Sequence, residues 1–209
     1  MIRFVFIMFC FPFLGMAQVN AVTEDGYQIQ VFEDGTWKYV DTTLNEKRFI
    51  KVNDKVFNVP ESSSFELASK VVDVHILLNE EDWYFMPSSD QDVTEFSFNN
   101  KNVEIYGLMI SENAKIPLEN LRNIAIINAR DNVENLKLIE EEYRLVNNLK
   151  LLYLCYEGEV EKLPLRYHNY YYSGEDGIVQ FITYARKDIA VKNADRMLNL
   201  LNGFTKSKD

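Results

Sequence analysis

Two histidines are the side chains of this chain best suited to metal binding. His75 and His168 fall on separate expected strands, and the run Glu140, Glu141 and Glu142 supplies carboxylates. Imidazole nitrogens and a carboxylate oxygen are ligands that suit zinc, so the histidines could meet one glutamate in space. The plainer interpretation is that His75 is hydrogen-bonded at a sheet edge and that His168 belongs to a polar strand face opposite Tyr167 and Tyr171. We therefore expect no metal site and no cofactor.

The glutamates could also suggest paired carboxylates for general acid and base catalysis. Neighbouring strand residues point to opposite faces, so only Glu140 and Glu142 share a side, and we expect a solvated strand face rather than a catalytic pair. The chain also lacks Gly-x-Ser-x-Gly, a glycine-rich phosphate loop, His-Glu-x-x-His and Cys-x-x-Cys. The sequence therefore predicts a protein without catalytic residues, which is not an enzyme.

Tyrosines gather at residues 167–172, and Tyr184 lies on the strand expected to pair with them. Tyrosine combines a large contact area with a polar tip and is common at recognition surfaces. Alternation divides the segment between two faces: Tyr167, Asn169 and Tyr171 on one, His168, Tyr170 and Tyr172 on the other. Both sets could pack across strands. The alternative is that one set faces outward, and for this we predict a binding surface of Tyr170, Tyr172, His168 and Tyr184.

Residues 1–17 have the pattern of a secretory signal peptide. Arg3 supplies a positive charge, Phe4–Leu14 is apolar but too short to span a hydrocarbon core of about 30 Å, and small residues precede Gln18. We expect cleavage before Gln18, no membrane span afterwards, and a secreted or periplasmic protein. An uncleaved amino-terminal anchor is the alternative. Cys10 lies inside the apolar run, which disfavours a lipoprotein.

The charge balance argues against nucleic acid as a partner. The chain has 22 basic and 32 acidic residues, a formal charge of −10, and removal of Arg3 with the leader makes it −11. An excess of negative charge repels a polyanion.

Cys155 is the only thiol left once the leader is removed. An unpaired thiol in an oxidising compartment is a hazard if exposed. Its neighbours at 151–156 are apolar on both alternating faces, as in a strand covered on two sides. We therefore expect a buried structural cysteine rather than a nucleophile.

Residues 18–61 are expected to form a small β-hairpin segment and a linker. Asp25-Gly26 and Asp34-Gly35 suit tight turns between β-prone runs, which predicts a three-stranded meander too small to be stable alone. We expect the meander to dock on the main domain or on a partner. The segment resembles the DGTWKYV-type hairpin near the start of many exported proteins of Bacteroidetes-type bacteria, a likeness that implies location only.

Residues 62–209 are expected to form one α+β domain, an antiparallel β-sheet flanked by helices. Pro117 suits the first turn of a helix over 117–131, and Gly203 suits the end of a helix over 189–202. Strands are expected over Val71–Leu78, Trp83–Met86, Val93–Phe98, Val103–Ser111, Leu136–Val146, Leu149–Tyr156, Leu165–Tyr172 and Ile178–Arg186.

The order of short motifs in this domain resembles the PsbP-like and Mog-like superfamily, over about Phe65 to Phe204. The motifs are Asp82-Trp83, Ile116-Pro117-Leu118, Glu142 to Asn147, Tyr170-Tyr171-Tyr172, Gly177 to Gln180, and Leu200 to Gly203. Asn148 departs from the pattern, since glycine is common there. The resemblance implies a sandwich used for binding or assembly, without known catalytic residues.

These observations predict an exported, non-enzymatic binding or assembly module whose partner is another envelope or secreted protein. They indicate neither a ligand nor an oligomeric state. One alternative is a hydrolase-like envelope enzyme with a cleft between the hairpin unit and the main domain. Another is a structural protein of the envelope, tethered by its amino terminus.

Overall fold

The computed structural model describes residues 19–23, 28–32, 36–40, 50–88 and 94–206. The expected signal peptide and both Asp-Gly turns lie outside these residues. Near the amino terminus, β1 (Val19–Val22), β2 (Gln28–Val31) and β3 (Trp37–Tyr39) form an antiparallel sheet in the order β1-β2-β3. This is the arrangement that the meander pattern predicts.

A sheet of eight strands forms the centre of the main domain, in the order β4-β10-β11-β12-β13-β9-β8-β7. All neighbours are antiparallel except β4 and β10, which are parallel. The strands are β4 (Lys51–Phe57), β7 (Trp83–Pro87), β8 (Thr94–Asn100), β9 (Ile105–Glu112), β10 (Glu134–Val146), β11 (Leu149–Val160), β12 (Leu163–Ser173) and β13 (Ile178–Arg186).

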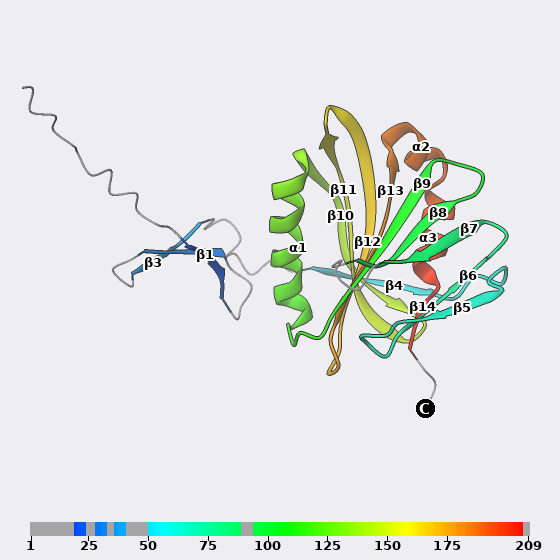
Figure 1. Ribbon diagram of the computed structural model, residues 1–209, viewed down its shortest axis with the longest axis horizontal. Coiled ribbons are helices and arrows are strands. Elements are labelled where there is room, and N and C mark those ends of the chain that lie inside the picture. The colour runs from blue at the N-terminus through cyan, green and yellow to red at the C-terminus, as the bar shows by residue number, and fades with distance from the viewer. Residues whose placement is uncertain (1–18, 24–27, 33–35, 41–49, 89–93, 207–209) are drawn as a thin grey trace, which may run out of the picture.

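Helices pack on both faces of this sheet (Figure 1). On one face lies α1 (Leu118–Asn132), and on the other lie α2 (Lys187–Lys192) and α3 (Ala194–Asn202). A small sheet lies beside α3, which contacts β6. It consists of β5 (Phe65–Ala68), β6 (His75–Leu78) and β14 (Phe204–Thr205), in the order β14-β6-β5. Strand alternation therefore divides the core into two apolar layers, one under α1 and one under α2, α3 and the small sheet.

The α+β fold is confirmed, and Ile178–Arg186 is a strand with the predicted bounds. Three local expectations differ from the structure. The strand predicted from Val71 begins only at His75, because the Ser69 hydroxyl accepts hydrogen bonds from the backbone N–H groups of Val71 and Val72 and holds a turn there. The last helix is interrupted at Asn193, whose ψ of 27° separates α2 from α3.

The third difference concerns the linker expected before residue 62. Residues 51–57 form β4, which pairs with β10 and so belongs to the main sheet. The Asn147 side chain accepts a hydrogen bond from the Val59 N–H at 2.8 Å and secures the segment that follows. Within the described ranges, no helix is long and apolar enough to cross a membrane.

Gly203 allows α3 to meet the small sheet. Its carbonyl accepts a hydrogen bond from the Leu77 N–H at 2.8 Å, and an added Cβ would overlap the Leu77 carbonyl oxygen. We expect Gly203→Ala to lower the free energy of unfolding by about 2 kcal/mol through overpacking, as measured by urea denaturation. The exposed control Val191→Ala should change it by less than about 0.5 kcal/mol. Equal values for the two variants would contradict this close approach.

Candidate functional site

A row of tyrosines crosses the sheet on the face that carries α1. Tyr156 of β11 pairs with Tyr167 of β12, Tyr167 with Tyr184 of β13, and Tyr184 with Tyr106 of β9. Successive ring centroids are 4.8, 5.7 and 5.5 Å apart, with the rings inclined by 25 to 31°. Tyrosines directly opposite on neighbouring strands are close enough for their rings to stack on one another along the row.

The row becomes more exposed toward the β7 edge. Helix α1 packs on β10, β11 and β12, so Tyr156 is buried, whereas Tyr106 is 40% exposed. Beyond Tyr106 the row continues through Asn99 of β8 to Tyr84 of β7, which is 61% exposed. We call the apolar side chains on the part of this sheet surface that no described helix covers the open face: Tyr84, Met86, Tyr106, Leu108, Ile110, Ile182 and Tyr184.

Three of the predicted binding residues lie on the opposite face, in the core. His168, Tyr170 and Tyr172 are 4%, 1% and 8% exposed, so the expectation that they face outward is wrong. The reason is that α3 and β14 cover this side: the Tyr170 hydroxyl donates to Asn202 at 2.7 Å, and the Tyr172 ring packs on Phe204.

Tyr184 is the predicted residue that reaches the open face, where it is half-buried. It does not join Tyr170 and Tyr172, because it lies opposite Tyr167 and shares that residue's face. Sequence reasoning missed Tyr106 and Tyr84. Their alternation within β9 and β7 was a usable signal, but their place beside Tyr184 depends on the strand order.

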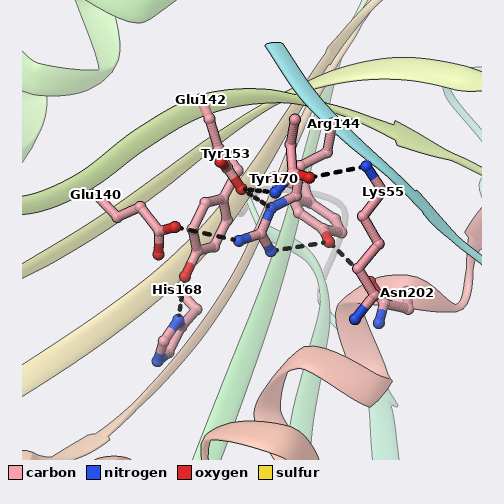
Figure 2. A network of polar contacts seen from close by, with 9 residues as sticks. Lys55, Glu140, Glu142, Arg144, Tyr153, His168, Tyr170 and Asn202 are labelled. Atoms are coloured by element: carbon pink, nitrogen blue, oxygen red, sulfur yellow. Dashed lines mark hydrogen bonds and ion pairs between the residues drawn. The ribbon is translucent and has the colours of Figure 1, made fainter. Parts of the chain in front are cut away.

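The buried face holds a polar network around Arg144 (Figure 2). Its Nε donates to Glu142 at 2.6 Å, and its guanidinium carbon lies 3.4 Å from the centroid of the Tyr153 ring. Glu142 also accepts a hydrogen bond from Asn53 of β4 at 2.8 Å. The ion pair, the ring and the amide compensate the buried charge, so this network joins β4 to the sheet.

The two histidines do not form the zinc site that their pattern could suggest. His75 lies on β6 beside Glu66, while His168 lies on β12, where its Nδ1 and the Tyr153 hydroxyl share a 2.6 Å hydrogen bond. Across the part of the chain that the structure describes, no three metal-binding side chains come together.

Cys155 is 2% exposed, which confirms its predicted burial. Burial raises the pKa of its thiol to about 11. Only the thiolate is a good nucleophile, so at neutral pH this cysteine is a protonated core residue.

No family model and no curated protein matches this chain. Solved structures match it in fold. The cyanobacterial PsbP protein CyanoP of Synechocystis sp. PCC 6803 has a TM-score of 0.54 at 12% identity, over 71% of this chain and 95% of that protein. LpqN of Mycobacterium tuberculosis, described as involved in cell envelope biogenesis, has a TM-score of 0.47 at 10% identity, over 65% of this chain and 83% of that protein. The match to CyanoP shows a PsbP-like α+β sandwich fold, as the motif order predicts.

The environment of His168 predicts a pH dependence of stability. Burial and the charges of Arg166 and Arg144 lower its pKa from 6.5 to about 4. Between these pH values the unfolded chain binds a proton that the folded chain excludes, so the free energy of unfolding rises with pH, by about 3 kcal/mol over the window. In urea denaturation across this pH range, the free energy of unfolding of His168→Gln should not show this rise with pH, whereas that of wild type and of His75→Gln should. An unchanged slope would contradict a neutral buried imidazole.

Proposed function

We propose that this protein is a non-catalytic, exported module of the cell envelope that binds another envelope or secreted protein through its open face. The single observation that carries the proposal is the uncovered half of the main sheet. Helix α1 packs on β10 to β12, and beyond it the sheet continues through β13, β9, β8 and β7, with tyrosines on β13, β9 and β7.

The composition of the open face supports a protein partner. Tyr84, Met86 and Tyr106 are 61%, 54% and 40% exposed, and tyrosine and methionine are enriched at protein interfaces. Leu108 and Ile182 lie half-buried on neighbouring strands and form an apolar centre. A partner that covers these side chains gains the hydrophobic free energy that the fold itself leaves unused.

The ring geometry favours contact through the edges and tips of the tyrosines. Tyr184 stacks on Tyr167 and meets the Tyr106 ring at a tilt of 31°, so the flat faces of Tyr184 are turned toward its neighbours in the row. The edges and hydroxyl groups of these tyrosines are what a covering partner meets. Burial raises the pKa of Tyr184, and that of Tyr167 to about 12, so both hydroxyls are neutral hydrogen-bonding groups at physiological pH.

The export of the protein rests on its amino-terminal sequence. Arg3, the apolar run Phe4–Leu14 and the small residues before Gln18 support a signal peptide and hence a secreted or periplasmic location. The buried, protonated state of Cys155 is compatible with an oxidising compartment, since it shields the one thiol of the mature chain.

Photo-crosslinking in the cells that make the protein tests this function. We expect the full chain with benzoylphenylalanine at Tyr106 or at Tyr84 to form the same discrete adduct. Benzoylphenylalanine at Val191, an exposed residue of α2, should form none. Adding Leu108→Asp should reduce the Tyr84 adduct at least fivefold, because it places a charge at the centre of the interface, whereas Val191→Asp should leave the adduct unchanged.

Two outcomes would contradict the proposal. Adducts that form equally from Val191, or that persist in the Leu108→Asp variant, would show that the partner does not bind through the open face. An adduct composed of two copies of this chain would replace the separate partner by self-association.

A further inference from the structure

A small hollow lies on the side of the domain that carries α3, away from the open face. Its walls come from residues 60–63, the β6–β7 turn, the start of β7 and helix α3, and its apolar part consists of Pro60, Leu78, Trp83 and Leu200. Asp82 and Arg196 supply one charge of each sign. The volume of about 180 Å³ is below the roughly 300–1,000 Å³ of pockets for drug-sized ligands, so the hollow suits one small molecule.

The two charges of the hollow lie side by side without close contact. Arg196 Nη1 is 3.8 Å from Asp82 Oδ1, whereas charge-assisted hydrogen bonds between such groups are about 2.7–2.9 Å long. Each side chain is about one third exposed, at 35% and 36%. An ion pair at this distance and open to solvent contributes little to stability, so both charges remain available to a ligand.

Neighbouring amides hold the two charged side chains in place. Asn79 donates to Asp82 Oδ2 at 3.1 Å, which leaves Oδ1 with longer contacts, at 3.5 Å to Asn102 and 3.8 Å to Arg196. Asn100 accepts a 3.2 Å hydrogen bond from Arg196 Nη1. The carboxylate and the guanidinium are thus oriented before any ligand enters, which lowers the entropy lost on binding.

We propose that this hollow binds a free α-amino acid with an apolar side chain. The ligand's carboxylate pairs with Arg196, its ammonium group pairs with Asp82, and its side chain lies against Trp83 and Leu200. A guanidinium matches a carboxylate in geometry as well as in charge. A zwitterion uses both charges of the hollow at once, whereas a simple acid or a simple amine leaves one of them without a ligand partner. This site is separate from the open face and extends the function beyond docking.

Trp83 provides a direct signal for binding, because it lines the hollow and the chain has only two tryptophans. In the otherwise intact protein, Trp37→Phe makes Trp83 the sole tryptophan. We expect L-leucine to change its fluorescence in a saturable manner. Isopentylamine and 4-methylpentanoate, which each lack one charge of leucine, should bind at least tenfold more weakly.

Two substitutions and a matched control test whether Arg196 and Asp82 bind the ligand. In the Trp37→Phe background, Arg196→Gln and Asp82→Asn should each weaken leucine binding at least tenfold. Asp195→Asn, an exposed residue of α3 next to Arg196 and outside the lining of the hollow, should change it less than twofold. Thermal unfolding followed by circular dichroism shows which variants are folded, and only those are compared.

The proposal fails if leucine gives no saturable change in fluorescence or in the amide resonances of Asn79 and Asn199. It also fails if 4-methylpentanoate binds as tightly as leucine and Asp82→Asn has no effect, since the site would then take a simple carboxylate. Neither outcome bears on the adducts from Tyr106, so failure here is distinguishable from failure of the docking function.

Discussion

The structure depends on a mismatch between the width of the main sheet and the width of its helical cover. Eight strands present two faces, and α2, α3 and the small sheet fill one of them. On the other face, α1 packs on β10, β11 and β12. Because strand alternation sends half of the side chains of β13, β9 and β7 to that second face, many of the residues beyond α1 remain partly exposed. Among them are tyrosines, a methionine and branched aliphatic residues, whose exposure to water costs free energy.

The interior is polar where the parallel strand β4 pairs with β10. Arg144 is 6% exposed, and it is compensated by Glu142, by the ring of Tyr153 and, through Glu142, by Asn53 of β4. A buried charge is tolerated only when its partners are fully in place, so this network specifies how β4 joins β10. The aromatic cluster that looks functional in the sequence therefore serves the architecture, while less conspicuous tyrosines face outward.

Local signals predicted the fold well. Pro117 is the N-cap residue of α1, and Ile178–Arg186 forms a strand over the predicted residues. Both could be predicted because turn chemistry and periodicity are properties of neighbouring residues. The candidate site was harder to predict. Which face of residues 167–172 is covered depends on α3 and β14, and the alignment of Tyr106 with Tyr184 depends on β9 lying beside β13. Contacts between segments so far apart along the chain leave no periodic trace in either segment.

Hydroxyl-radical footprinting of the open face tests the central claim most directly. The account predicts that Met86 and Tyr106 of the purified protein oxidise readily, because both are exposed, and that the same residues are protected at least fivefold in intact cells, where a partner covers them. Tyr143, buried under α1, should react weakly in both settings. Equal oxidation of Met86 and Tyr106 in the purified protein and in intact cells would contradict the claim that a partner binds the open face.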